Sequence, residues 1–340
     1  MPGGNKMKKY SIILPVRNGG SYVRECVNSI LAQTLDDFNC IILDNCSTDG
    51  TSEWIASLND PRIISHRSGR SLTIVENWSR VRDVPKNEFM TMIGHDDILD
   101  PDYLAVMDKL IGKHPGAGLY QAHFRYIDSR GETLRFCQPM DEHQTAAEFL
   151  AFSLTGNIDI MGTGFLMRSV DYDRAGGIPP YPNLLFADFE LWIELSRNGY
   201  KATAPEECFA FRLHQSTTTT SSDVNYHYAF ERFVGYLEKL RSADPSMKWM
   251  INRYAIQFLD AYCKGLTHRL LRTPVKKRGG LTVRDLVAKC RQWADRLVPG
   301  NHFDPYKRFN MKLARAIDRY WLSRQMFLLF KKLYAHPLYS

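Results

Sequence analysis

The sequence lacks the features of a membrane-spanning or secreted protein. No run of about 18 uninterrupted apolar residues occurs in its 340 residues, so no transmembrane helix is predicted. Residues 1–9 contain glycine and lysine and precede an apolar run that is too short for a signal peptide. The seven cysteines are odd in number and show no CxxC spacing, so they indicate neither a zinc ribbon nor a disulfide framework. We therefore expect a cytoplasmic protein.

Negative charge is scarce in the last third of the chain. Residues 223–340 hold 23 Lys and Arg against 9 Asp and Glu, whereas residues 1–222 hold 21 against 28. The polar run STTTTSS (216–222) lies just before this change and is typical of a linker. We therefore predict a first domain over 1–222 and a basic, helical C-terminal region over 223–340.

Strand and helix patterns alternate in the first domain. Short apolar runs at 11–14, 40–43, 62–65 and 88–93 predict strands, and amphipathic or capped segments at 21–33, 51–58 and 101–112 predict helices. Such an alternation indicates an α/β fold with a mostly parallel sheet flanked by helices.

Polar residues follow three of these strands, at 15–18, 44–49 and 94–97. In open α/β sheets, ligands bind beyond the carboxyl ends of the strands, so these residues should line one binding rim. Asp96 and Asp97 could share a divalent cation there through hard oxygen ligands. They could equally cap the helix that begins near Pro101.

A series of motifs resembles the inverting glycosyltransferases of family 2. In chain order the motifs are IILPVRN, IILDNCSTDGT, ENW, MIGHDDILDPDYL, MGTGFLMR, FADFELWIEL and FRLH. The resemblance covers about residues 9–222. It implies a GT-A fold, related to the Rossmann fold, with a nucleotide-binding half over about 9–112 and an acceptor-side half over about 113–222.

The resemblance also implies roles for individual residues. Asp44 would bind the base, Asn77 would lie near the nucleotide, and Asp96 would lie near the ribose. Asp97 and His214 would bind a divalent metal, Mn²⁺ or Mg²⁺, although many family members carry a further aspartate where Gly94 stands. The nucleotide pocket would also be lined by Pro15, Val16, Arg17 and Asn18.

Asp188 would be the catalytic base by the same resemblance, although Ala187 replaces the usual glutamate beside it. Residues 188–198 read as a helix with Asp188 in its first turn, where the helix dipole favours an anion and should keep it ionised. The alternative is an ordinary helix cap. Acceptor-side contacts are expected from Gly164, Tyr181 and Trp192, although the glycines of MGTGFLMR also suit a tight bend at a strand edge.

The C-terminal region should be mostly helical, over 224–242, 247–273, 281–297 and 304–334. Its last segment interleaves aromatic and aliphatic residues with lysine and arginine, which suits an anionic membrane interface. Packing within the protein and a homo-oligomer surface remain alternatives. No nucleic-acid-binding motif accompanies the positive charge, so no nucleic-acid partner is expected.

The sequence as a whole thus favours a metal-dependent inverting glycosyltransferase. The resemblance implies a UDP-sugar donor and transfer of a hexosyl or N-acetylhexosaminyl group to a hydroxyl of a glycan or lipid-linked acceptor. We expect it to lie in the cytoplasm or peripherally on the inner face of the cell membrane. The alternatives are a nucleotidyltransferase and a non-catalytic module that binds sugar nucleotides or glycans.

Overall fold

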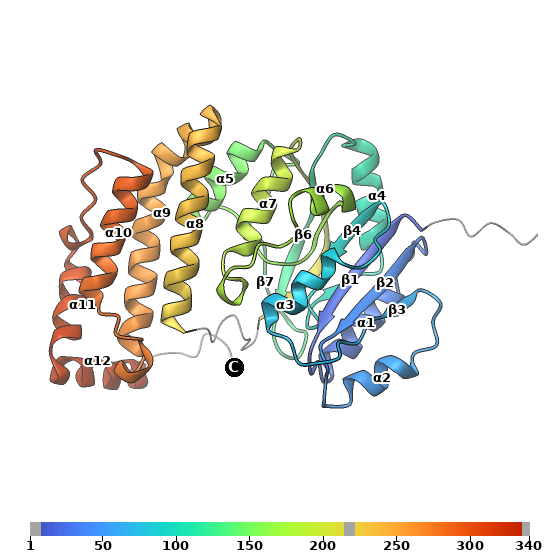
Figure 1. Cartoon of the computed structure of the whole chain (residues 1–340), viewed down its shortest axis with the longest axis horizontal. Coiled ribbons are helices and arrows are strands. Elements are labelled where there is room, and N and C mark those ends of the chain that lie inside the picture. The colour runs from blue at the N-terminus through green and yellow to red at the C-terminus, as the bar shows by residue number, and fades with distance from the viewer. Residues whose placement is uncertain (1–7, 214–221, 335–340) are drawn as a thin grey trace, which may run out of the picture. The chain divides into compact units, whose positions relative to one another are not determined.

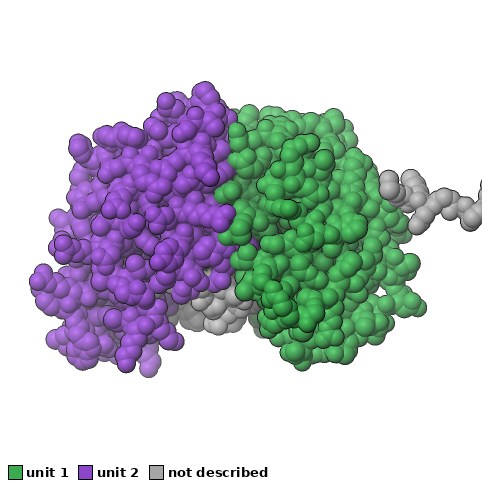
Figure 2. Space-filling view, in the orientation of Figure 1, with its two compact units in different colours: residues 1–149, 158–180, 187–214 green, residues 150–157, 181–186, 215–340 purple. Residues whose placement is uncertain are grey.

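The computed structural model describes residues 8–213 and 222–334. The chain divides into two compact units, which are coloured separately in Figure 2. Unit 1 comprises residues 1–149, 158–180 and 187–214, and unit 2 comprises residues 150–157, 181–186 and 215–340.

Unit 1 contains a twisted mixed sheet with helices packed around it (Figure 1). Its strands are β1 Tyr10–Val16, β2 Phe38–Asp44, β3 Ile63–Ser65, β4 Phe89–Met92, β5 Ile98–Leu99, β6 Leu119–Ile127, β7 Thr133–Phe136, β8 His143–Gln144, β9 Phe165–Arg168 and β10 Lys201–Arg212. Their order is β3-β2-β1-β4-β9-β6-β10-β5, with β7 paired to β6 and β8 to β10.

The first four strands are parallel, as their alternation with helices predicts. Every residue of β1 is buried, which explains its unbroken apolar run. The register pairs Val16 with Asp44, so the polar segments that follow β1 and β2 start side by side.

The second half of the sheet departs from the parallel pattern. Strand β9 pairs antiparallel to both β4 and β6, and β10 runs parallel to β6 but antiparallel to β5. The sheet is therefore mixed, with its longer pairings parallel and its shorter ones antiparallel. These strands are joined by pairings between segments far apart in the chain, which local sequence patterns do not encode.

The helices are α1 Tyr22–Leu31, α2 Thr51–Ser57, α3 Ile74–Ser79, α4 Tyr103–Lys113, α5 Ala146–Thr155, α6 Ser169–Arg174, α7 Ala187–Arg197, α8 Asp223–Ala243, α9 Pro245–Arg272, α10 Val283–Leu297, α11 Phe309–Arg319 and α12 Trp321–Tyr334. None of the described helices is long and apolar enough to cross a membrane.

Unit 2 is built on α8, α9 and α10, which pack against one another (Figure 1). Aromatic rings form part of its core: Phe230 stacks on Tyr262 with ring centroids 3.4 Å apart, and Trp293 lies 5.1 Å from Phe230. The single helix expected over 304–334 is wrong, because the chain becomes extended at Tyr320 and separates α11 from α12. The Ser323 hydroxyl donates to the Tyr320 carbonyl at this break.

Candidate active site

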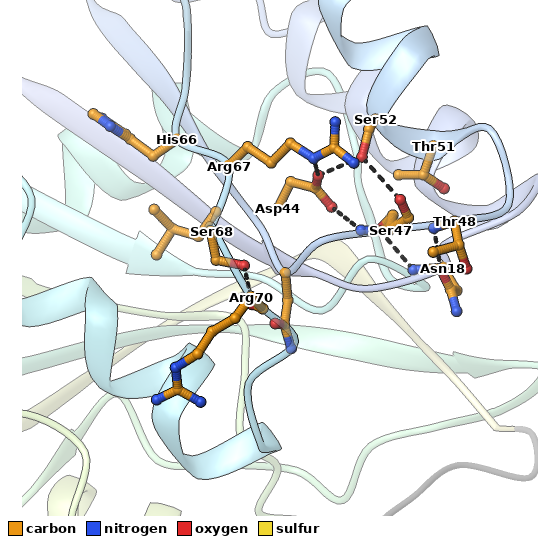
Figure 3. Close-up of polar contacts among 12 residues, drawn as sticks. Asn18, Asp44, Ser47, Thr48, Thr51, Ser52, His66, Arg67, Ser68 and Arg70 are labelled. Atoms are coloured by element: carbon orange, nitrogen blue, oxygen red, sulfur yellow. Dashed lines mark hydrogen bonds and ion pairs between the residues drawn. The ribbon is translucent and has the colours of Figure 1, made fainter.

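The segment that follows β1 is tied to the segment that follows β2. Asn18 adopts a left-handed conformation with φ 52°, which asparagine tolerates better than most residues. Its backbone N–H donates to Ser47 Oγ at 2.9 Å, and its side-chain oxygen accepts from the Thr48 N–H at 2.9 Å (Figure 3). Pro15 and Val16 are buried in β1, whereas Arg17 is exposed. The sequence PVRN thus ends a core strand and holds one wall of the rim.

Asp44 is a buried carboxylate with a fixed orientation. Its Oδ1 accepts from the Ser47 N–H at 3.2 Å and its Oδ2 from the Ser52 hydroxyl at 2.5 Å. Arg67, which is largely exposed, places Nε 3.6 Å from the same Oδ2 (Figure 3). The sequence analysis did not single out Arg67. Its guanidinium brings a positive charge to the residue that the resemblance assigns to base binding.

Asn77 lies beneath this rim and acts on it through Arg80. The Asn77 side-chain oxygen accepts from Arg80 Nη1 at 2.9 Å, and the same Nη1 donates to the Asp44 carbonyl at 3.1 Å. Arg80 Nη2 donates to the His66 carbonyl at 2.6 Å. Since Asn77 is buried, these contacts make it a support for β2 and the segment after β3.

Two further side chains hold the segment after β3 against the rim. Asn45 donates to the Leu72 carbonyl at 2.9 Å and accepts from the Leu72 N–H at 2.7 Å, so it binds both backbone groups of one residue. Arg17 donates to the same carbonyl at 3.3 Å. The segment after β3 therefore joins the segments after β1 and β2 on this side of the rim, held by side-chain to backbone bonds.

The turn after β4 carries the two adjacent carboxylates. Asp97 is 2 % exposed; its Oδ2 accepts from the Thr163 hydroxyl at 2.7 Å and its Oδ1 from the Arg212 N–H at 3.0 Å. Burial and the neighbouring charge of Asp96 raise the pKa of Asp97 well above its usual value. Asp96 is less buried than Asp97. A buried carboxylate beside a second carboxylate is the arrangement that a bound cation stabilises.

Gly94 leaves room for these two carboxylates. A Cβ atom at position 94 would lie 2.6 Å from Asp96 Oδ1 and 2.9 Å from Asp97 Oδ2, so both oxygens converge on the space above this glycine. The described residues contain no cluster of three or more His, Cys, Asp or Glu side chains that could hold a metal ion. A pair of carboxylates still fits Mg²⁺ or Mn²⁺, because such ions commonly take one or two carboxylates together with substrate phosphates.

Arg212 is a central residue of this turn that the sequence analysis missed. Its guanidinium donates to the Asp96 carbonyl at 2.8 Å and to Glu25 at 2.7 Å, and it lies 4.6 Å from the centre of the Tyr22 ring. The side chain is fully buried. Arg212 stands in the FRLH motif, so the motif was informative although only its histidine was selected.

Asp188 lies in the first turn of α7, as the sequence predicts. Burial raises the pKa of this carboxyl to about 6, and the hydrogen bond from the Phe189 N–H at 3.0 Å opposes that rise. The helix dipole was expected to keep this carboxyl ionised, but desolvation is the larger effect and raises its pKa. At neutral pH the group is nevertheless mostly ionised and able to accept a proton.

Residues 161–164 connect α7 with the Asp96–Asp97 turn. The indole N–H of Trp192 donates to the Met161 carbonyl at 2.9 Å, while Thr163 holds Asp97. Asp188 is four residues before Trp192 and thus shares its face of the helix. That face of α7 is directed toward the segment that orients the carboxylate pair.

The three acceptor-side residues have packing roles. Trp192 is buried and stacks on Phe165 with centroids 4.6 Å apart. Gly164 has φ +78°, and a Cβ there would lie 2.8 Å from the Phe209 ring. Tyr181 is buried in unit 2 with the Arg232 guanidinium 4.5 Å from its ring centre, so its ring face is not open to an acceptor. His214 lies outside the described residues.

Comparisons with known proteins point to one family of enzymes. Residues 11–175 match the glycosyl transferase family 2 model. An uncharacterized glycosyltransferase of Rickettsia typhi is 24 % identical over 302 residues, which cover 83 % of this chain and 91 % of that protein.

Solved structures of glycosyltransferases share the fold. S. aureus TarS, in complex with UDP-GlcNAc, superposes with a TM-score of 0.64 and 14 % identity over 94 % of this chain and 89 % of that one. The mannosyltransferase PcManGT of Pyrobaculum calidifontis, in complex with GDP-Man and Mn²⁺, superposes with a TM-score of 0.53 and 15 % identity. The match covers 96 % of this chain and 89 % of that one. These findings favour a transferase over a nucleotidyltransferase or a non-catalytic module. The chain therefore carries a glycosyl transferase family 2 domain over residues 11–175 and has the GT-A fold.

Proposed function

We propose that this glycosyltransferase moves a hexosyl or N-acetylhexosaminyl group from a UDP-sugar to a hydroxyl acceptor, with inversion at the anomeric carbon. The observation that carries the proposal is the segment 161–164, which bonds to the carboxylate pair through Thr163 and to α7 through Met161. One short segment thereby links the groups that would hold the donor diphosphate to the helix that carries the base.

The donor would lie along the rim after β1, β2 and β3. Asp44 offers a fixed carboxylate to the base, Arg17 and Asn18 would line the pocket, and Arg67 adds a cation beside Asp44. Support for a nucleotide-sugar comes from TarS, whose structure contains UDP-GlcNAc, and from PcManGT, whose structure contains GDP-Man.

Asp96 and Asp97, with His214 as a further ligand, would hold a divalent metal. Support for the metal comes from the convergence of the two carboxylates above Gly94 and from the Mn²⁺ in PcManGT. Bound there, the ion would supply positive charge to offset the negative charge that develops on the leaving diphosphate.

Asp188 would act as the general base. Its carboxylate accepts the proton of the acceptor hydroxyl while the oxygen forms a bond to the anomeric carbon. The bond between that carbon and the diphosphate oxygen breaks, and the electron pair leaves with the diphosphate. Attack on the face opposite the leaving group inverts the configuration.

The acceptor would be a lipid-linked or cell-surface glycan precursor, as in polysaccharide biosynthesis. Support for an acceptor at a membrane comes from the basic composition of residues 223–340.

A transfer assay tests the proposal. UDP-glucose, UDP-galactose, UDP-N-acetylglucosamine and GDP-mannose are supplied in turn with Mn²⁺ and extracted glycolipids, and nucleoside diphosphate release is measured. We expect release from a UDP-sugar by the wild type and by Glu194→Gln, but not by Asp188→Asn. Glu194 is the control because it is a partly exposed acidic residue of α7 that pairs with Arg197. Equal release by Asp188→Asn and the control would contradict the role of Asp188.

A further inference from the structure

The last helix that the structure describes, α12, has most of its large apolar side chains exposed. Among the α12 side chains that the structure describes, only that of Arg324 is buried. Six large apolar residues of α12 are 54–74 % exposed: Trp321, Leu322, Met326, Leu329, Phe330 and Leu333. A helix that only had to pack on its own protein would show the opposite distribution.

Helix α11 continues this surface. Met311 and Ala314 are buried, while Phe309 and Leu313 on the same helix are 78 % and 47 % exposed. We define the α11–α12 face as the exposed apolar residues of the two helices: Phe309, Leu313, Trp321, Leu322, Met326, Leu329, Phe330 and Leu333. Exposed apolar side chains gathered on two packed helices mark an interaction site, and three of them, Leu313, Met326 and Phe330, line one groove.

An apolar groove opens beside this face, inside unit 2. It has a volume of about 550 Å³ and is lined mainly by apolar side chains of α9, α11 and α12, among them Leu271, Ile317 and Phe327. Lys264 and Lys331 also line it. A pocket of this size suits a flexible apolar chain whose polar end carries negative charge.

The segment that carries the face is basic, although Asp260 of α9 pairs with one of its arginines, Arg308, at 2.9 Å. Residues 305–334 contain eight Lys and Arg but one acidic residue, Asp318. Asp318 is occupied elsewhere, because its Oδ1 accepts from the buried Arg278 at 2.5 Å and its Oδ2 from the Val283 N–H at 2.8 Å. Within the described residues, no acidic side chain forms an ion pair with Lys331 or Lys332.

We propose that the α11–α12 face docks on an anionic lipid bilayer, with an acyl chain of a bilayer lipid in the groove between α9, α11 and α12. Charge complementarity favours an anionic bilayer as the partner of this face. Aromatic and aliphatic side chains would enter the interface while lysine and arginine meet lipid phosphates. A second copy of the chain would instead bring the same positive charges against each other. The docking goes beyond sugar transfer and does not depend on it.

Vesicle flotation of the full chain tests this inference. The protein is mixed with vesicles of phosphatidylglycerol and phosphatidylcholine, or of phosphatidylcholine alone, and the floated fraction is measured at low and high salt. We expect flotation only with the anionic vesicles, and less of it at high salt. Trp321→Glu with Leu329→Glu should weaken binding by at least about tenfold, and Lys331→Gln with Lys332→Gln should weaken it less.

The matched control is Trp249→Glu with Val275→Glu. These residues are 55 % and 62 % exposed and lie in unit 2 outside the α11–α12 face. The control should float like the wild type, and circular dichroism should show equal helix content in all variants. Failure of the wild type to float would overturn the proposal. Equal flotation of the Trp321→Glu/Leu329→Glu variant and the Trp249→Glu/Val275→Glu control would overturn it as well. The face would instead bind a second copy of the chain if three results came together: the wild type is a dimer, it does not float, and the Trp321→Glu/Leu329→Glu variant is a monomer.

Discussion

A carboxylate that must accept a proton works best when its pKa lies near the working pH. Burial raises the pKa of Asp188 to about 6, and only the ionised form can act as base. We therefore expect kcat/KM to fall as the pH drops through about 6 and to level off above it. Asp188→Asn should lower kcat by about 10²–10⁴-fold and abolish this acidic limb. A pH profile of the transfer rate that is unchanged in the variant would contradict the assignment.

Asp188 should also affect the free energy of unfolding. Because its folded-state pKa is raised, the folded protein holds the proton more tightly than the unfolded chain does between about pH 4 and 6. Ionising Asp188 therefore destabilises the folded protein, and its free energy of unfolding falls as the pH rises through this window. Asp188→Asn should be more stable than the wild type at pH 7, by up to about 3 kcal/mol, and the difference should vanish near pH 3.5. Urea unfolding at both pH values measures it, and no difference at pH 7 would contradict the desolvation.

Gly94 offers a direct test of the carboxylate pair. In Gly94→Ala the new Cβ would meet Asp96 Oδ1 and Asp97 Oδ2 at under 3 Å, so the two side chains must move. We expect loss of metal-dependent nucleotide binding in a titration. Gly112→Ala is the control, because an added Cβ on this exposed glycine of α4 meets no atom within 4 Å. Equal binding by the two variants would show that the carboxylates do not contribute.

Single residues also show where sequence reasoning ends. Asp96, Asp97 and Asp188 could be selected because each stands at the start or end of a predicted element. Arg212 and Thr163 could not, because their importance comes from bonds to Asp96 and Asp97 across long stretches of chain. No local pattern records such a partner.

At the scale of elements, the short helix α3 holds Asn77 and Arg80 in place. Its first turn has a capping box in which Thr73 accepts from the Glu76 N–H and Glu76 accepts from the Thr73 N–H. Thr73→Ala should cost about 1 kcal/mol of stability and weaken nucleotide binding. The control is Thr282→Ala, which removes an equivalent capping box from α10 in unit 2. It should cost similar stability in urea without changing nucleotide affinity; weaker binding in both would argue against a specific role for α3.

The elements that the sequence predicted well are those with local signals. Strands β1, β2 and β4 lie within about two residues of the predicted runs, and α4 and α7 begin within about two residues of the expected starts. The antiparallel insertion of β9 and the long strand β10 required knowledge of distant pairings. No glycine or proline lies near Tyr320, so the sequence gives no signal of the break between α11 and α12.

At the scale of the whole molecule, a buried lysine should govern the pH dependence of stability in unit 1. Lys201 bonds to Thr203 Oγ1 at 2.6 Å and to Gln144 Oε1 at 3.2 Å, and burial lowers its pKa to about 7. The unfolded chain therefore binds more protons than the folded protein between about pH 7 and 10. Burial of Lys201 destabilises the fold at pH 7, and this destabilisation decreases as the pH rises through that window.

Lys201→Met should accordingly raise the melting temperature at pH 7, and its advantage over the wild type should shrink toward pH 10. Lys109→Met, at an exposed position of α4, is the control and should show no such trend. A constant difference between Lys201→Met and the wild type across this range would contradict a buried neutral lysine.

The central claim is that the rim and the carboxylate pair bind a nucleotide together with a divalent metal. The most direct measurement is calorimetric titration of UDP, GDP and dTDP, with and without Mn²⁺, into the wild type, Asp96→Asn and the control Asp102→Asn at the exposed start of α4. The account predicts metal-dependent binding of UDP that is lost in Asp96→Asn and kept in Asp102→Asn. Binding that is equal with and without Mn²⁺, or unchanged in Asp96→Asn, would contradict it.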